Sequence, residues 1–200
     1  MRILVATMNE GKLREYERLL ADVPGLELET MASLSEPVDV LEDRDTFTGN
    51  ALKKATAIAA ASGMACLADD SGLEVDALGG RPGVYSARYA GEGATDAENN
   101  AKLIEELLGK AGQERTARFR CAIAIVDSAG RALATVEGAC EGRIGDEPKG
   151  THGFGYDPLF IPKGYDQTMA ELGLETKNEI SHRAKAAAKL VPLLQQLQTR

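Results

Sequence analysis

Tryptophan is absent from this chain of 200 residues, and histidine occurs only twice. Long hydrophobic runs are also missing, because no apolar stretch approaches the roughly 20 residues that a transmembrane helix needs. The opening, MRILVATMNEGK, becomes polar after a few residues, which is not typical of a signal peptide. We therefore expect a soluble, cytoplasmic protein with no membrane partner.

Cysteine is scarce, and its spacing excludes the common metal motifs. The three cysteines, Cys66, Cys121 and Cys140, form no CxxC pair and are flanked by small or apolar residues. We expect them to be reduced and mostly buried in the core.

Positive charge is in deficit, since 23 Lys and Arg face 31 Asp and Glu for a formal net charge of -8. Non-specific nucleic-acid binding depends on neutralising many phosphates with a basic surface, so a nucleic-acid partner is not expected. A small polyphosphate remains compatible, because a local cluster of basic residues with a divalent cation can reverse the field in one place.

Helices alternate with strands in the first half of the chain, and a hairpin is expected later. Periodicity predicts strands over 2–7, 26–31, 64–68, 119–127, 132–141 and 154–161, and helices over 12–21, 46–62 and 95–108. A last helix is expected to begin at Ser181, with Ala187 and Ala188 on its apolar side, and Pro192 is expected to kink or divide it. This order predicts one domain with an α/β or α+β fold around a mixed sheet.

A polar segment joins the first strand to the first helix. It consists of Thr7, Met8, Asn9, Glu10, Gly11 and Lys12. A helix N-terminus offers unpaired N–H groups and the positive end of a dipole, so this segment suits phosphate oxygens. It is not a P-loop, because the GxxxxGK[ST] pattern is incomplete. The alternative is that Thr7 or Asn9 caps the helix and Lys12 is solvated.

Two adjacent carboxylates follow the strand predicted over 64–68, in the Asp-Asp-Ser-Gly segment at 69–72. Ligands bind at the carboxyl ends of strands in open α/β sheets, and magnesium prefers one or two carboxylates together with phosphate oxygens. If the strand geometry persists, only one of the two faces a metal while the other braces the turn. A turn with aspartates bonded to their own backbone is the alternative. Glu42 or Asp43 could add a second ligand, or lie in a solvated loop.

Two later segments contain aromatic and basic groups. In Gly-Phe-Gly-Tyr-Asp-Pro at 153–158, glycines allow close approach to a flat ligand, an aromatic ring can stack on a base, and Asp157 can accept a hydrogen bond. A β-bulge with core aromatics is the alternative. Lys177 and Ser-His-Arg at 181–183 offer donors for a carbonyl or a phosphate, or form a solvated surface.

In their order along the chain, these segments resemble the inosine/xanthosine triphosphate pyrophosphatase family from Thr7 to Arg183. The matching blocks are TxNxGK, TFxxNAxxKA, ADDSGLxVDxLGGxPGVYSARYAG, GFGYDP and ISHR. The resemblance implies magnesium-dependent hydrolysis of non-standard purine triphosphates to monophosphate and pyrophosphate. It also implies an elongated mixed sheet with two α/β lobes flanking a central cleft, in a homodimer.

The resemblance further implies a role for each matching residue. It makes Asp70 the catalytic carboxylate and a magnesium ligand, with Glu42 as the second ligand. It assigns the remaining matching residues to the substrate: Thr7, Asn9, Lys12, Ser71, Phe154, Tyr156, Asp157, Lys177, His182 and Arg183. Met8, Glu10, Gly11 and Gly155 are included as neighbours within the same blocks. Many relatives have Glu-Thr-Gly or Glu-Asp-Gly where this chain has Glu42-Asp43-Arg44-Asp45, so Asp43 and Asp45 remain alternatives to Glu42.

Overall fold

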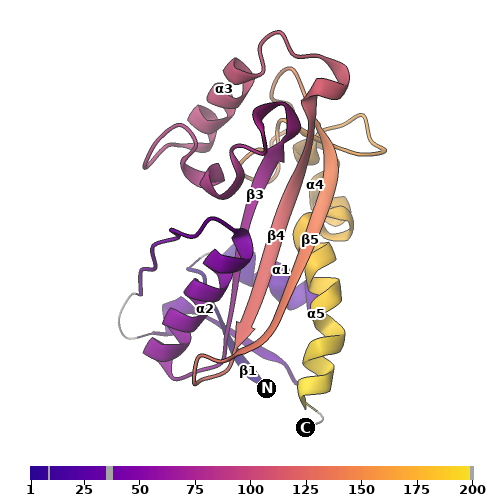
Figure 1. Cartoon of the computed structure of the whole chain (residues 1–200). Coiled ribbons are helices and arrows are strands. Elements are labelled where there is room, and N and C mark those ends of the chain that lie inside the picture. Colours follow the sequence, from indigo (N-terminus) through magenta and orange to yellow (C-terminus); the bar gives the residue numbers. More distant parts are fainter. Residues whose placement is uncertain (9, 35–37, 199–200) are drawn as a thin grey trace. The chain divides into compact units, whose positions relative to one another are not determined.

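A computed structural model describes residues 1–8, 10–34 and 38–198 of the protein (Figure 1). Six strands form one mixed sheet in the order β2-β1-β3-β4-β5-β6. β1 is parallel to β2 and β3, whereas β5 and β6 are antiparallel. The strands are β1 (Arg2–Val5), β2 (Glu27–Thr30), β3 (Cys66–Val75), β4 (Thr116–Val126), β5 (Ala132–Ile144) and β6 (Phe160–Pro162). The predicted mixed-sheet α/β architecture is confirmed.

Five α-helices accompany these strands in the described chain. They are α1 (Glu10–Leu19), α2 (Phe47–Ser62), α3 (Asp96–Glu106), α4 (Met169–Ile180) and α5 (His182–Gln198). Four short 3₁₀ helices are η1 (Met31–Ser33), η2 (Asp76–Leu78), η3 (Gly83–Arg88) and η4 (Gly112–Arg115). No described helix is both long enough and apolar enough to cross a membrane.

The chain divides into two compact units. The first unit contains Met1–Asp70, Cys121–Gly138 and Arg183–Arg200, and the second contains Ser71–Arg120 and Ala139–His182. The chain therefore passes from one unit to the other within β3, β4 and β5 and at the start of α5.

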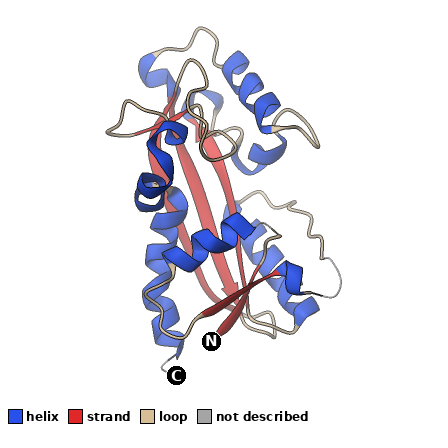
Figure 2. Ribbon diagram, turned by 180° about the vertical axis from the view of Figure 1, so that it is seen from behind, coloured by secondary structure: helices blue, strands red, loops and turns tan. Residues whose placement is uncertain are grey.

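The core of the first unit lies between the sheet and two helices. Ile3 on β1, Tyr16 on α1 and Leu190 on α5 belong to one buried cluster. Figure 2 turns the face covered by α1 and α5 toward the reader, whereas Figure 1 shows α2 on the other face. Ala51, Ala55 and Ala59 recur at every fourth position of α2 and are fully buried, so small side chains let this helix lie close to its neighbours.

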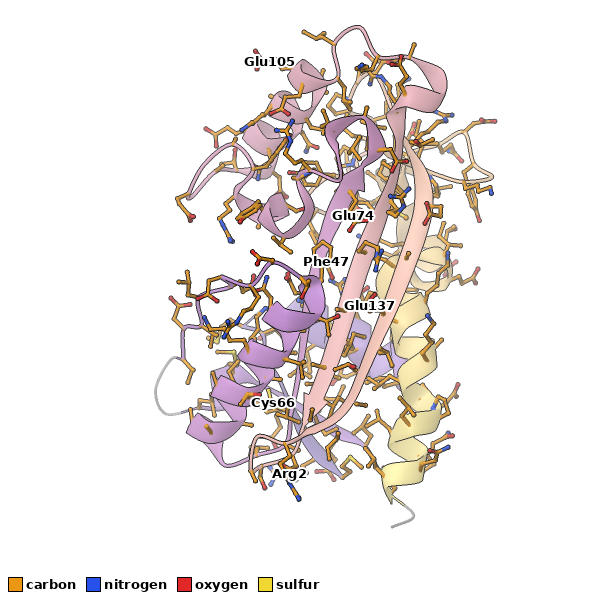
Figure 3. The ribbon with its side chains drawn as sticks, in the orientation of Figure 1. Arg2, Phe47, Cys66, Glu74, Glu105 and Glu137 are labelled. Atoms are coloured by element: carbon orange, nitrogen blue, oxygen red, sulfur yellow. The ribbon has the colours of Figure 1, made fainter. Side chains whose placement is uncertain are left out.

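The beginning of α2 is fixed by its cap and by a contact with the hairpin. The Thr46 side chain caps the helix by accepting from Gly49 N. Thr48 Oγ1 donates to Glu137 on β5 across 2.6 Å. Figure 3 labels Glu137 and Phe47, the residue that precedes Thr48. These contacts set where the loop before α2 meets the helix.

The core of the second unit gathers apolar side chains from α3, α4 and the strands. Leu103 on α3, Phe119 on β4, Phe160 on β6 and Met169 on α4 belong to this cluster. α3 begins with a capping box, in which the Thr95 and Glu98 side chains each accept from the other's backbone N–H. α4 is not anticipated from the sequence, and it is interrupted at Gly173, where φ is 80°.

Two predicted strands are wrong in extent. β3 does not end at residue 68 but continues through residues 69–72, because the carboxylates there are bonded to other side chains rather than to a local turn. Residues 154–159 are not a strand: Gly153 and Gly155 have φ of 85° and 60°, and Asp157 N donates to Phe154 O across 3.2 Å in a turn. The real strand there, β6, is only three residues long.

The last helix differs from the expectation in two details. Pro192 does not divide α5, which continues from His182 to Gln198 with Pro192 on its exposed side, where a missing N–H is tolerated. Ala184, Ala187 and Leu194 are buried, as predicted, but Ala188 is exposed and Ala186 and Leu190 are fully buried in its place. The three cysteines are free and buried, as predicted.

Replacing Gly142 on β5 with alanine should destabilise the protein. Gly142 pairs with Pro162 of β6, and a Cβ atom there would lie 2.3 Å from the Ile161 carbonyl oxygen. Backbone cannot move aside without breaking the strand pair, so we expect a loss of about 1–3 kcal/mol in the free energy of unfolding by urea. Gly145→Ala is the matched control, because its new Cβ would meet its nearest atoms at 3.4 Å. Equal stabilities of the two variants would contradict this account.

Candidate active site

The segment after β1 forms the predicted strand–loop–helix junction in the first unit. Thr7 is nearly buried and its backbone is held on both sides, since Thr7 N donates to Val5 O and Thr7 O accepts from Met31 N. Met8 is exposed, Glu10 begins α1, and Gly11 and Lys12 lie in its first turn. Asn9 lies outside the described residues. The positive end of the α1 dipole is therefore next to this loop.

Asp69 is the centre of a buried ion network. Its Oδ1 atom lies 2.5 Å from Lys12 Nζ, and its Oδ2 atom accepts from Arg183 Nε and Nη2 at 3.3 Å each. Arg183 Nη1 also donates to Glu15 on α1 across 3.0 Å. Burial opposes ionisation of Asp69, but Lys12 and Arg183 outweigh it and hold the pKa of its carboxyl well below the usual range. Asp69 is thus a carboxylate already neutralised by protein cations.

Asp70 points to a different set of partners, as alternation along a strand requires. Asn50 on α2 donates through Nδ2 to Asp70 Oδ2 across 2.9 Å, and Asn50 Oδ1 accepts from Arg44 N at 2.8 Å. Burial raises the pKa of Asp70 to about 6; the Asn50 hydrogen bond opposes this rise and the negative charge of Glu42 adds to it. Asp70 is therefore a buried carboxyl group under the influence of another carboxylate, and neither Asn50 nor the charge of Lys54 outweighs the effect of burial on its pKa.

Two lysines of α2 arrange the acidic loop that precedes the helix. Lys54 forms an ion pair with Glu42 and donates to the Asp69 carbonyl oxygen across 3.1 Å. Lys53 binds Asp43 and the Leu41 carbonyl oxygen, at 2.8 Å each. Asp43 is thus bonded to Lys53, while the charge of Glu42 acts on Asp70.

The carboxylates of Asp70 and Glu42 fit a magnesium ion. No group of three or more His, Cys, Asp or Glu side chains able to hold a metal occurs in the described part of the chain. Magnesium needs fewer, because it is commonly held by one or two carboxylates and completed by phosphate oxygens and water. Burial, and to a lesser extent the charge of Glu42, raises the pKa of Asp70, and a divalent cation would stabilise its ionised form.

The second unit gathers the predicted aromatic and basic residues around Asp157. The Asp157 carboxylate is buried, forms an ion pair with Lys177, and accepts from Phe154 N across 3.0 Å. The Lys177 ammonium lies 4.5 Å from the centroid of the Phe154 ring. Phe154 itself is 59% exposed. This geometry presents a supported aromatic ring to a flat ligand.

Tyr156 and His182 have different surroundings from Phe154. Tyr156 is buried in the core of the second unit, and its hydroxyl donates to the Ser86 carbonyl oxygen across 2.8 Å. His182 is buried and stacks on Phe119, with ring centroids 4.9 Å apart. Of the two aromatic residues of the GFGYDP segment, only Phe154 therefore has a ring open to stacking.

The structure groups the predicted residues differently from their order in sequence. Lys12, Glu42, Asp70 and Arg183 belong to the first unit, while Ser71, next to Asp70 on β3, belongs to the second. Lys177 and His182 belong to the second unit, whereas Arg183 belongs to the first, where Asp69 and Glu15 hold its guanidinium.

Sequence reasoning did not single out Asn50, Lys54 or Glu15 as members of the site. Asn50 and Lys54 are both present in the TFxxNAxxKA block, four residues apart and therefore on one side of α2. That spacing is the signal that could have identified them. Glu15 follows Lys12 by one turn of α1, and only the structure places Arg183 against it.

The first unit has lysines, a carboxylate that protein cations neutralise (Asp69) and a carboxyl group with a raised pKa (Asp70). Together with the N-terminus of α1, these groups make a site suited to a polyphosphate and a divalent cation. The chain belongs to the Ham1 family, which matches residues 3–193.

Curated relatives match over nearly the full length of the chain. The dITP/XTP pyrophosphatase of Desulforamulus reducens is 52% identical over 197 residues, which cover 98% of this chain and 97% of the relative. The dITP/XTP pyrophosphatase of Bacillus subtilis is 50% identical over 192 residues, 96% of each chain.

Solved structures agree with the fold. A HAM1 protein from Coxiella burnetii is 40% identical with a TM-score of 0.90, over 98% of this chain and 99% of its own. A nucleoside-triphosphatase, dITP/XTP pyrophosphatase, from Mycobacterium abscessus is 44% identical with a TM-score of 0.79, over 97% and 100% of the two chains.

Removing the Asp70 charge should stabilise the metal-free protein at high pH. The folded-state pKa of about 6 lies above the ordinary value of 3.8, so the stability gained from protonated Asp70 is complete below pH 3.8 and is lost as pH rises through 6. Asp70→Asn avoids that loss. In EDTA, we expect its free energy of unfolding relative to wild type to increase by up to about 3 kcal/mol between pH 4 and pH 8.

The matched control for this experiment is Asp146→Asn, because the Asp146 side chain is 92% exposed. Its stability relative to wild type should stay constant over the same pH range. A constant difference for Asp70→Asn as well would show that Asp70 titrates normally in the folded protein.

Proposed function

We propose that this protein hydrolyses non-standard purine nucleoside triphosphates, namely ITP, dITP and XTP, to the monophosphate and pyrophosphate, and that magnesium is its cofactor. The observation that supports the reaction is the buried Asp70 carboxyl group under the charge of Glu42, with Lys54 bound to Glu42 and Lys12 in the first turn of α1. The relatives' shared name, dITP/XTP pyrophosphatase, supports the substrate class.

In this proposal the first unit handles the triphosphate. Magnesium, held by Asp70 and Glu42, would neutralise phosphate charge and polarise the phosphoryl group. Thr7, Asn9, Gly11 and the neighbouring N–H groups at the start of α1 would bind phosphate oxygens, and Lys12 would stabilise the departing pyrophosphate. Met8 and Glu10 would contribute through their backbone positions in that loop.

Asp70 would orient the attacking water or accept its proton. The water oxygen bonds to the α-phosphorus while the bond from that phosphorus to the oxygen bridging to the β-phosphorus breaks, and the electron pair leaves with pyrophosphate. Asn50 supports this role, because it fixes one carboxylate oxygen of Asp70 and leaves the other for water or metal. Ser71 would lie beside the substrate as the next residue of β3.

The second unit would select the base. Phe154 offers a ring for stacking, and Lys177 and His182 supply donors that suit the 6-carbonyl of hypoxanthine or xanthine. Adenine presents an amino donor at that position, and a site built for an acceptor leaves it unpaired. Asp157, Gly155 and Tyr156 would hold the loop, and Arg183 would act through Asp69 in the first unit.

The resemblance to the family also implies a homodimer, and the charge and hydrophobic pattern of the sequence predict a cytoplasmic location with no nucleic-acid or membrane partner. No contact of the described chain bears on the homodimer, which stays a prediction. The same holds for the location.

Asp70→Asn should abolish most of the activity. At saturating magnesium and ITP, we expect kcat for pyrophosphate release to fall by about 10²- to 10⁴-fold, the usual contribution of a positioned proton acceptor. Asp166→Asn serves as the control, since the Asp166 side chain is fully exposed and lies 3.9 Å from Arg143 in a long surface ion pair. A kcat for Asp70→Asn close to that of wild type would remove Asp70 from the mechanism.

A substrate panel tests the proposed function directly. We expect kcat/KM for ITP, dITP and XTP to exceed the value for ATP by about 10⁴-fold, as in other sites that read a hydrogen-bonding group of the substrate. Two other functions would give different results in the same magnesium-dependent assay. Preference for dTTP or UTP would indicate a pyrimidine triphosphate pyrophosphatase, and binding without pyrophosphate release would indicate a regulatory nucleotide-binding protein.

A further inference from the structure

Gly155, between Phe154 and Tyr156, has both of its backbone polar groups bound by side chains of one helix. Asp96 Oδ2 accepts from Gly155 N across 2.6 Å, and Asn100 Nδ2 donates to Gly155 O across 2.9 Å. The two residues are four positions apart on α3, so they lie on the same side of the helix. All of these residues belong to the second unit.

The helix that makes these contacts is itself fixed. Its N-terminus has the complete capping box of Thr95 and Glu98, and its opposite end buries Leu103 and Leu107 in the core. Glu105, on another side of α3, points outward (Figure 3). α3 is therefore a rigid support with one side turned to the loop at 153–158.

That loop needs support from outside because it has no regular structure. Gly155 adopts φ of 60°, and no strand partner binds its backbone. Its neighbours are held separately, Tyr156 through its hydroxyl to Ser86 O and Phe154 through its N–H to Asp157. The direction in which the exposed Phe154 ring projects therefore depends on the peptide groups on both sides of Gly155.

We propose that Asp96 and Asn100 are positioning residues for base selection, acting through Gly155 on the Phe154 ring. This inference rests on the proposed function, because it assumes that Phe154 stacks on the purine. Asp96 and Asn100 form a clamp of one acceptor and one donor on Gly155. This clamp resists both a peptide flip at Gly155 and a displacement of the loop from α3. A loop held in this way presents Phe154 in one orientation before the substrate arrives, which lowers the entropic cost of binding.

The test uses one variant for each half of the clamp. Asp96→Ala removes the acceptor, and Asn100→Asp replaces the amide donor with an oxygen of nearly the same shape. We expect each to raise KM for ITP three- to tenfold, the effect of losing one hydrogen bond, with kcat changed less than twofold. A purine stacked on a displaced ring would also be displaced from Lys177, whose ammonium lies 4.5 Å from the Phe154 ring centroid, so we expect the ratio of kcat/KM for ITP to that for ATP to fall by a similar factor.

Two further variants separate positioning from general stability. Asp96→Asn keeps an oxygen acceptor, so its KM for ITP should be close to that of wild type. Glu98→Ala removes a capping contact of the same helix without touching Gly155, so it should lower Tm and leave the ratio of ITP to ATP unchanged.

The outcomes distinguish this inference from the proposed function. A wild-type protein that releases no pyrophosphate from ITP overturns both. An active wild-type protein whose ITP-to-ATP ratio is unchanged in Asp96→Ala and Asn100→Asp overturns only the inference. So does an equal fall in kcat for both nucleotides, or a Glu98→Ala variant that loses selectivity to the same degree.

Discussion

Asp69 binds two cations that come from opposite ends of the chain, and the arrangement of the first unit depends on this interaction. Lys12 belongs to the first turn of α1 and Arg183 to the first turn of α5, while Asp69 lies inside β3. A fully buried carboxylate is stable only when it is paired and hydrogen-bonded, and Asp69 satisfies that condition through both helices. The network therefore fixes the position of Lys12 relative to β3, and with it the loop that precedes α1.

The next residue on the strand has the opposite electrostatic character. Asp70 receives one hydrogen bond from Asn50 and lies near Glu42, so burial and like charge raise its pKa instead of lowering it. Two adjacent aspartates thus serve two purposes because a strand turns them to different neighbours: one is neutralised by the protein and the other is left for a cation. Shifts in opposite directions at neighbouring groups are a common sign of a functional site.

Much of this arrangement could be predicted from the sequence, and the limits have identifiable causes. The α1 junction, the Thr46 cap, the α3 capping box and the hairpin between β4 and β5 follow from local rules that act over a few residues. The path of β3 through residues 69–72 could not be predicted from local rules, because side chains far away in sequence hold these turn-forming residues in a strand. Alternation still predicted that the two aspartates would face differently.

The roles of individual polar residues were harder to predict for the same reason. Tyr156 is an aromatic residue that could stack on a base, but its hydroxyl donates to a carbonyl oxygen and its ring packs in the core. Arg183 follows His182 directly, but its guanidinium binds Asp69 whereas the His182 ring stacks on Phe119. Asn50 and Lys54 were visible as a spacing on α2, but their partners, Asp70 and Glu42, come from other elements.

The direct succession of His182 and Arg183 has a consequence for how the sequence can change over evolution. One side chain stacks on Phe119 and the next binds Asp69, so the first turn of α5 serves two different neighbourhoods. Each added or deleted residue in a helix rotates everything beyond it by about 100°. A single insertion at this junction would leave at least one of the two side chains pointing away from its partner. Substitutions can accumulate along the outer side of α5, but its first turn must keep its length.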